Sequence, residues 1–286
     1  MGQIKRNMYK KIQTTLCIIL VSIIFLFPLS STYSQQNNFV NDSISFIQIK
    51  TDSLFNSRQI INLLTLPKSS FNKYRIKFVC SDPDLNTTSW FGETENALAS
   101  VNGSFFDVDS GGSVTYVEIN DSIIGRTRSS DLKWAKPDSL IDGAVIETKD
   151  YNIKIQPVKS DDFYEKSKQE AAVMVAGPLL LLDSKKVKLP QMEFATKRHP
   201  RTCLCTNKDS VMFIVIDGRR KDAEGMNLYE AQEFLQDLGC VDAINLDGGG
   251  SSTMWIKDKG VVNSPSDSTG ERPVSNVLLI INENQE

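Results

Sequence analysis

The stretch NLDGGGSSTMW, residues 245–255, is the part of this 286-residue chain best equipped for chemistry. Its three consecutive glycines can adopt positive φ and present successive amide N–H groups, which together form a nest for an anion. A glycine-rich β-turn is the alternative. The lysine and the spacing of GxxxxGK[ST] are absent, so a nucleotide-binding P-loop is excluded. The candidate carboxylate and ligands here are Asn245, Asp247, Gly248, Gly249, Gly250, Ser251 and Ser252.

The chain contains one histidine, His199, in KRHPRT. More than one histidine is needed for a zinc-protease site, a two-metal histidine site or a paired-histidine phosphodiesterase site, so these sites are excluded. A serine–histidine–aspartate triad needs only one, but no GxSxG motif is present. Because proline follows, we interpret His199 as an extended loop residue. Carboxylates, arginines, amides and glycine backbone remain, which suit glycosyl or phosphoryl chemistry.

Two stretches offer further binding groups. In VNGSFFD, Asn102 and Gly103 end an apolar strand, and the amide is a candidate ligand for a sugar hydroxyl; a plain turn is the alternative. In HPRT, Arg201 and Thr202 open a strand. The guanidinium fork matches a phosphate, although a lone arginine is more often solvated or in a surface ion pair.

Two more carboxylates join Asp247 as catalytic candidates. In VIDGRR, Asp217 ends a very apolar strand and is followed by Gly218 and Arg219. Such strand ends often present catalytic carboxylates, but Asp-Gly is also a common turn. Glu230 stands three residues after Asn227, the spacing of a capping box, so it has a structural alternative.

Alternating apolar and polar residues predict a strand-rich α+β domain with a mixed or antiparallel sheet. The run AAVMVAGPLLLL, residues 171–182, is typical of a strand buried on both faces. Apolar residues at helical spacing in NLYEAQEFLQDLGC predict an amphipathic helix packed on the sheet. Asn227 is its expected N-cap and Gly239 its stop. Residues 35 to about 45 are polar, and we expect a loose tail there.

A basic segment, an apolar run of 14 residues and small residues near Ser34 predict a signal peptide over residues 1–34. We therefore expect export to the periplasm or medium, with no stable membrane anchor after cleavage. The net charge of −3 and pI near 5.4 argue against a nucleic-acid partner. No feature indicates a particular oligomeric state.

Four cysteines remain after the signal peptide, an even number that permits disulfides in an oxidising compartment; buried free thiols are the alternative. Cys203 and Cys205 face one side of a strand and are poorly placed to bond each other. The absence of a CxxC pair argues against a structural zinc site. The remaining two are Cys80 and Cys240.

In chain order, these motifs resemble the phosphodiester glycosidase family. The resemblance runs from about Ala97 to Ile281 and rests on VNGSFFD, AGP, RHPRT, IDGR, the long run through NLDGGGSS, and VVNSPSD…ERPVSNVLLI. The fourth residue of VNGSFFD departs from the family's usual glycine: Ser104 stands there. We assign residues 96–284 to this domain, and residues 35–95 to a tail with extra strands or a subdomain.

The resemblance implies a glycoside hydrolase that cleaves a sugar-1-phosphodiester, releasing the sugar and a phosphomonoester. Arg201 and the glycine run would then hold the phosphate. Asp247 is favoured as nucleophile or base, with Asp217 and Glu230 as further carboxylates. Asn102, Asn245, Asn263 and Arg272 would orient sugar hydroxyls.

Two alternatives stay open. One is a non-catalytic glycan-binding or exopolysaccharide-binding protein on the same fold. The other is a phosphodiesterase that cuts the P–O bond with a divalent cation. We expect no required cofactor and no metal ligands, although acidic side chains could bind calcium. The expected partner is a glycan or sugar phosphate.

Overall fold

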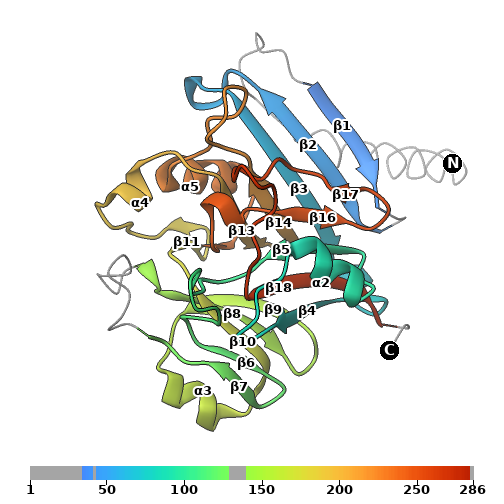
Figure 1. Cartoon of the computed structure of the whole chain (residues 1–286), viewed down its shortest axis with the longest axis vertical. Helices are drawn as coiled ribbons and strands as arrows, with labels where there is room; N and C mark the ends of the chain where they lie inside the picture. Colours follow the sequence, from blue (N-terminus) through green and yellow to red (C-terminus); the bar gives the residue numbers. More distant parts are fainter. Residues whose placement is uncertain (1–33, 41–42, 129–139, 284–286) are drawn as a thin grey trace, which may run out of the picture. The chain divides into compact units, whose positions relative to one another are not determined.

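The computed structural model describes residues 34–40, 43–128 and 140–283, with only the backbone of residues 34–39. The predicted signal peptide therefore lies outside the described residues except for Ser34. All described residues belong to one compact unit. Three antiparallel sheets and a few helices make up this unit, which confirms the α+β prediction (Figure 1).

The largest sheet has eight strands. In order across the sheet they are β1 (Ser34–Phe39), β2 (Ser45–Thr51), β3 (Gln59–Pro67), β14 (Ser210–Ile216), β13 (Arg201–Thr206), β15 (Asp242–Asn245), β11 (Leu179–Leu182) and β12 (Lys185–Lys186). Strands β2 and β3 thus extend the sheet that contains β13–β15. Strand β1 pairs along its length with β2, so the loose tail expected there is wrong for these residues.

The two smaller sheets have five strands each. One runs β17 (Gly260–Val261), β16 (Met254–Ile256), β5 (Ala99–Asn102), β18 (Asn276–Asn282) and β4 (Tyr74–Cys80). The other runs β7 (Ser122–Gly125), β6 (Val117–Ile119), β10 (Glu170–Ala176), β8 (Gly143–Thr148) and β9 (Ile153–Pro157).

The apolar run 171–182 forms two strands in different sheets, so its interpretation as one buried strand is wrong. Strand β10 belongs to a five-stranded sheet and β11 to the eight-stranded sheet. Gly177, with a φ of 156°, and Pro178 separate them. Proline cannot donate a ladder hydrogen bond, so the chain leaves one sheet here and enters the next.

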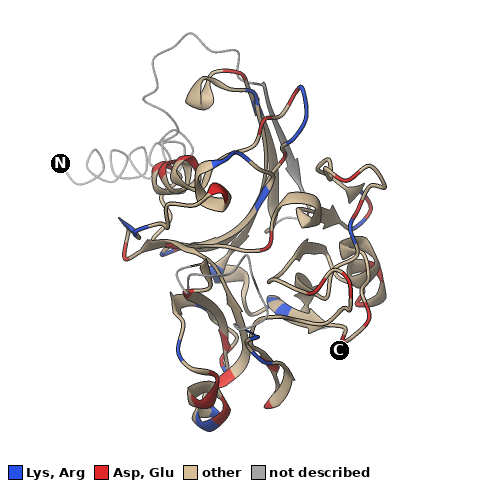
Figure 2. Ribbon diagram, turned by 60° about the vertical axis from the view of Figure 1, so that its left-hand side comes forward, with Lys and Arg blue, Asp and Glu red and all other residues tan. Residues whose placement is uncertain are grey.

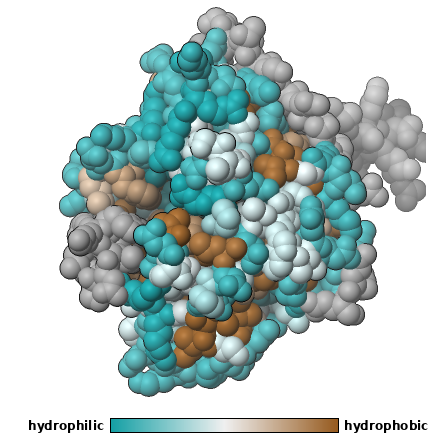
Figure 3. Space-filling model, in the orientation of Figure 1, coloured by the Kyte–Doolittle hydropathy of each residue, from teal (hydrophilic) through white to brown (hydrophobic). Residues whose placement is uncertain are grey.

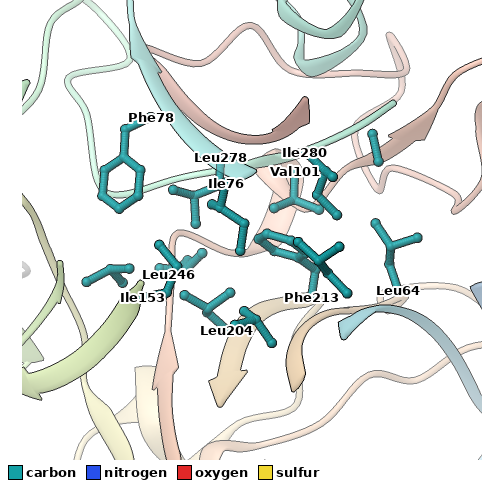
Figure 4. Close-up of a cluster of buried hydrophobic side chains, with 14 of the residues drawn as sticks. Leu64, Ile76, Phe78, Val101, Ile153, Leu204, Phe213, Leu246, Leu278 and Ile280 are labelled. Atoms are coloured by element: carbon teal, nitrogen blue, oxygen red, sulfur yellow. The ribbon is translucent and has the colours of Figure 1, made fainter. Parts of the chain in front are cut away.

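The sheets face each other across a shared apolar core. Leu64, Leu204 and Phe213 of the eight-stranded sheet meet Ile76, Phe78, Val101, Leu278 and Ile280 of the sheet around β18 (Figure 4). Ile153 of β9 joins the same cluster. This packing fixes the ends of the strands relative to one another.

The helices of the described residues are short, and the predicted amphipathic helix is the longest among them. The described α-helices are α2 (Thr88–Thr94), α3 (Asp161–Ser167), α4 (Glu193–Thr196) and α5 (Leu228–Asp237). Helix α5 buries Leu228, Ala231 and Leu235 against the eight-stranded sheet, as its apolar spacing predicts. None of the helices in the described part of the chain is long and apolar enough to cross a membrane.

A disulfide joins Cys205 of β13 to Cys240, just after α5, with the Cα atoms 5.7 Å apart. It ties the helix end to the sheet. Cys203 is a buried free thiol and Cys80 a half-buried one. Both alternatives raised by the sequence therefore apply, each to one pair of cysteines.

The surface seen in Figure 3 is hydrophilic around much of its rim, with hydrophobic residues in separate patches nearer the centre. Scattered patches of this kind are normal for a globular surface.

Candidate active site

Four strand ends that are distant in the chain meet at one edge of the eight-stranded sheet. Arg201, the first residue of β13, pairs with Ile216 at the end of β14, and Cys203 pairs with Asn245 at the end of β15. Strand β5 reaches the same place, because the Asp247 N–H donates to the Gly103 carbonyl at 2.9 Å. Most residues selected from the sequence therefore converge.

Asp247 stands at the centre of this convergence, two residues beyond β15. As a whole residue, Asp247 is half-buried. Burial raises the pKa of the carboxyl to about 6, although the Ser251 hydroxyl, the Gly248 N–H and the charge of Arg272 act in the opposite direction. A carboxyl with a pKa near neutrality is suited to acid–base or nucleophilic work.

Asn102 fixes the backbone on which Asp247 stands. Its Nδ2 donates to the Asp247 carbonyl at 2.6 Å, while its Oδ1 accepts from the Thr202 hydroxyl at 2.7 Å and the Thr253 N–H at 3.2 Å. The side chain is fully buried with all these atoms occupied. The structure thus favours a bracing role for Asn102 and Thr202 over the sugar contact expected for Asn102.

The three glycines are required for different reasons. Gly249 has a φ of 64°, as the sequence suggested. Gly248 and Gly250 are needed for close approach: a Cβ on Gly248 would lie 2.9 Å from the Pro200 carbonyl oxygen, and one on Gly250 would lie 2.2 Å from Arg272 Nη2. A side chain on Gly248 would press on this backbone, whereas one on Gly250 would displace the ends of the Arg272 and Asp267 side chains.

The loop is not the open nest of amides that the sequence suggested. The Gly249 N–H donates to the Pro200 carbonyl at 2.9 Å, and the N–H groups of Ser251 and Ser252 donate back to Gly248 and Gly249 at 3.3 Å. Residues Gly249–Ser251 form a short 3₁₀ turn, which uses these donors internally. Three N–H groups of the run are therefore already bonded within the protein.

Two guanidinium groups border the turn. Arg219 is exposed, and a Cβ on Gly249 would lie 3.1 Å from its Nη2. No ion pair of Arg219 occurs among the described residues. Arg272 lies against Gly250 and forms a bidentate pair with Asp267, at 2.8 and 3.1 Å. Asp267 was not among the site residues predicted from the sequence. The one sequence feature that could have indicated it is an acidic residue five positions before Arg272.

Arg201 is placed differently from our expectation. It is only 1% exposed, and its Nε and Nη2 donate to the carbonyls of Met226, Phe194 and Lys197 at 2.6 to 3.1 Å. Its guanidinium also lies over the Phe194 ring, 4.9 Å from the centroid. The structure favours Arg201 as a residue that organises the loop before β13, rather than as a direct phosphate ligand.

Asp217 lies beneath the glycine turn and is 1% exposed. Its carboxylate accepts from Asn263 Nδ2 and the Ser264 N–H, both at 3.2 Å. Asn263 Nδ2 also donates to the Ser252 carbonyl at 2.9 Å, so Asn263 connects the carboxylate to the glycine run. Burial raises the pKa of Asp217 to about 6, partly offset by Ser264 and Asn263.

Glu230 has the structural role that its spacing allowed. The capping box with Asn227 is present in both directions. Arg198 Nε also donates to both Glu230 oxygens, at 3.1 and 3.0 Å. With its oxygens bonded to the helix N-terminus and to Arg198, Glu230 is poorly suited to the catalytic role that the resemblance suggested.

His199 is more than a plain loop residue. Its backbone pairs with Met226, and its Nδ1 lies 3.4 Å from Arg219 Nη2. Burial, followed by the charges of Arg201, Arg219 and Lys197, lowers the pKa of His199 to about 4. A neutral imidazole at physiological pH can accept a hydrogen bond from Arg219 and help to orient it.

The remaining predicted ligands are buried parts of the scaffold. Asn245 Nδ2 donates to the carbonyls of Gly177 and Leu246 at 2.9 and 2.6 Å, whereas its Oδ1 has no partner among the described residues. Gly218 packs closely on Pro200: a Cβ added to Gly218 would lie 2.6 Å from the Pro200 nitrogen.

Within the described ranges, no group of three His, Cys, Asp or Glu side chains is arranged to hold a metal ion. Acidic and basic residues are interspersed along the ribbon (Figure 2). Near the glycine turn, Arg219 is exposed and Arg272 is paired with Asp267, so the positive charge there does not belong to a general basic surface.

A sequence model of the family described as phosphodiester glycosidase matches residues 95–281. The chain belongs to the phosphodiester glycosidase family. The matched segment includes Asp217, Asp247 and both guanidiniums that border the turn.

The individual proteins that the chain resembles in sequence are distant. The chain is 34% identical over 84 residues to the SPbeta prophage-derived uncharacterized protein YomE of Bacillus subtilis, covering 29% of this chain and 13% of that protein. It is 32% identical over 94 residues to the mouse N-acetylglucosamine-1-phosphodiester alpha-N-acetylglucosaminidase, covering 31% of this chain and 18% of that protein. The aligned segments thus span less than a fifth of these relatives.

The fold is shared more widely than the sequence. The catalytic domain of the zebrafish N-acetylglucosamine-1-phosphodiester alpha-N-acetylglucosaminidase, auto-inhibited by its pro-peptide, superimposes with a TM-score of 0.64 at 18% identity. The match covers 87% of this chain and 88% of that domain. It therefore extends well beyond residues 95–281 and takes in strands that precede the matched family segment.

Proposed function

We propose that this protein hydrolyses the bond between the anomeric carbon of a sugar and a phosphodiester oxygen, releasing the sugar and a phosphomonoester. The observation that carries the proposal is Asp247: a half-buried carboxyl with a pKa near 6, on a loop held by Asn102 and flanked by two guanidiniums. Membership of the phosphodiester glycosidase family supports the reaction class.

The residues suggest a division of labour. Arg219 and Arg272 neutralise the phosphate as the C1–O bond breaks and the electron pair leaves on the phosphate oxygen. Ionised Asp247 attacks C1 or takes the proton of the attacking water. A phosphate is already a good leaving group, so strong protonation of the departing oxygen is less important than in ordinary glycosides.

Asp217 is the second carboxyl of the proposed mechanism. It is buried below the turn and connected to it through Asn263. We assign it the positioning of Asn263 and of the backbone at Ser252. This assignment replaces the more direct role that its strand-end position suggested.

We also propose that the enzyme acts outside the cytoplasm. The apolar segment near the N-terminus supports export. The Cys205–Cys240 disulfide supports an oxidising compartment.

The test uses the purified protein with UDP-N-acetylglucosamine as a sugar-phosphate probe in ¹⁸O-water, with products followed by NMR. Label on the sugar C1 is the expected result, with rates unchanged by EDTA. Label on phosphate would instead identify P–O cleavage. Absence of turnover across sugar phosphates with several different sugars would contradict the proposal and favour a glycan-binding protein.

A further inference from the structure

A cavity of about 370 Å³ opens away from Asp247, between β4, the turn after β8 and the start of β10. Its volume lies within the range of about 300–1,000 Å³ that is usual for small-molecule sites.

The cavity and the candidate active site lie towards opposite ends of β10. At the C-terminal end of β10, the Gly177 carbonyl accepts from Asn245, next to the glycine turn. Glu170, at the other end of β10, lines the cavity. A strand of seven residues spans roughly 20 Å, so the two sites are separated by about that distance.

The chemistry of the cavity suits a neutral, hydroxyl-rich ligand. Phe78, Ile119 and Ala171 contribute apolar surface. Three cations and three carboxylates also line it, so their formal charges sum to zero: Arg75, Lys77, Lys149, Asp121, Glu147 and Glu170. Such a lining supplies both donors and acceptors without net attraction for an anion, and sugar hydroxyls use both.

Tyr151 adds an aromatic surface that the fold does not require. It lies in the β8–β9 turn with a φ of 61°, a conformation disfavoured for a bulky residue and favoured for Gly, Asn or Asp. The side-chain hydrogen bonds of this turn are made by Thr148, Asp150 and Asn152. Tyr151 is nevertheless 38% exposed, with the Arg75 guanidinium 4.9 Å from its ring centroid. Strained residues of this kind concentrate at functional sites.

We propose that this cavity binds a neutral sugar unit of a glycan, with the exposed surface of the Tyr151 ring against the sugar and the charged lining bonded to its hydroxyls. The inference extends the proposed function, because it makes the substrate class a glycan longer than a single sugar phosphate. The binding itself needs no catalysis.

The test titrates the protein with N-acetylglucosamine, its β-1,4-linked trimer and maltotriose, and follows backbone amide shifts by NMR. We expect at least one sugar to shift amides of residues 75–77 and 147–151 with a millimolar dissociation constant. Tyr151→Asn should weaken this binding at least tenfold while keeping the turn, since asparagine tolerates positive φ. Tyr151→Phe should retain it.

The matched control is Phe163→Ala. Phe163 is 40% exposed and has Lys159 over its ring, but it does not line the cavity. Equal affinity of Tyr151→Asn and wild type would overturn the inference, as would shifts confined to the Asp247 loop, shifts caused by inorganic phosphate alone, or no shift with any sugar. Turnover of UDP-N-acetylglucosamine, measured in parallel, reports on the proposed function separately, and we expect Tyr151→Asn to leave it unchanged.

Discussion

The side chain of Asn102, at the end of β5, hydrogen-bonds the backbone carbonyl of Asp247, 145 residues further along the chain. This bond joins the end of β5 to the loop that bears the candidate catalytic carboxyl. Asn102→Ala would leave the Asp247 carbonyl, the Thr202 hydroxyl and the Thr253 N–H without their partner. We expect a loss of about 2–3 kcal/mol in unfolding free energy and about 10²-fold in turnover. Urea unfolding and steady-state kinetics measure both, and a stability change below about 0.5 kcal/mol would contradict the bracing role.

Asp247→Asn should abolish most turnover, by about 10³-fold or more, because the amide can neither attack C1 nor accept a proton. Folding should remain intact, since the amide is isosteric and removes a buried charge. The matched control is Asp222→Asn, whose side chain is 58% exposed and paired with Arg220. Retained activity in Asp247→Asn, measured by sugar release, would remove Asp247 from the mechanism.

Substitutions of Arg219 and Arg201 should have different effects, the first on substrate binding and turnover and the second on stability. Arg219→Ala should reduce kcat/KM by about 10²-fold or more with little change in melting temperature, because the side chain is exposed and its guanidinium borders the turn. Arg201→Ala should instead destabilise the fold by about 3 kcal/mol or more, since its buried guanidinium bonds three carbonyls. Thermal unfolding and kinetics of both variants decide this; the reverse pattern would restore Arg201 as the phosphate ligand.

Asp217 should make stability depend on pH. Burial raises its pKa from 3.8 to about 6, so the folded state binds the proton more tightly than the unfolded state does. The contribution of Asp217 to the unfolding free energy is therefore greatest below about pH 4 and is lost as the pH rises through 6. Asp217→Asn cannot ionise, so its stability relative to wild type should increase by about 2–3 kcal/mol between pH 4 and pH 7. Urea unfolding of both proteins at the two pH values measures this; a difference independent of pH would contradict it.

Reduction of the Cys205–Cys240 disulfide should destabilise the protein. The bond closes a loop of 35 residues, for which the loss of unfolded-state entropy corresponds to about 3–4 kcal/mol. We expect the double variant Cys205→Ser, Cys240→Ser to melt at a lower temperature and to be insensitive to dithiothreitol. Cys80→Ser is the control, because Cys80 is a free thiol near the Ser275 hydroxyl. Equal melting temperatures of wild type with and without reductant would count against the bond.

Periodicity in the sequence was sufficient to predict the α+β class and helix α5, because the apolar spacing of α5 is that of a helix packed on one face. It was insufficient for the run 171–182, where the apolar character continues across a change of sheet. Strand β3 was also missed. Its apolar run is buried in the middle of the largest sheet, so it lacks the alternation that marks a half-buried strand.

Residue types predicted which segments meet at the site, but not how each side chain is used. Arg201 and Arg219 are both arginines near strand ends, yet one is buried against carbonyls and the other is exposed at the turn. Glu230 is similar: its capping spacing was visible, but the bond to Arg198 depends on packing between α5 and the loop before β13. Such differences arise from tertiary contacts, which local patterns do not contain.

The position of β18 between β5 and β4 has a consequence for folding. Arg75 of β4 pairs with Ile281 of β18, so this sheet closes a loop of roughly 200 residues. Pairings this distant are slow to form, and β5 has no neighbour on its β18 side until they do. Asn102 pairs with Val277, so the end of β5 has both of its neighbouring strands only after β18 has been synthesised. During refolding, enzymatic activity should therefore recover with the slowest kinetic phase.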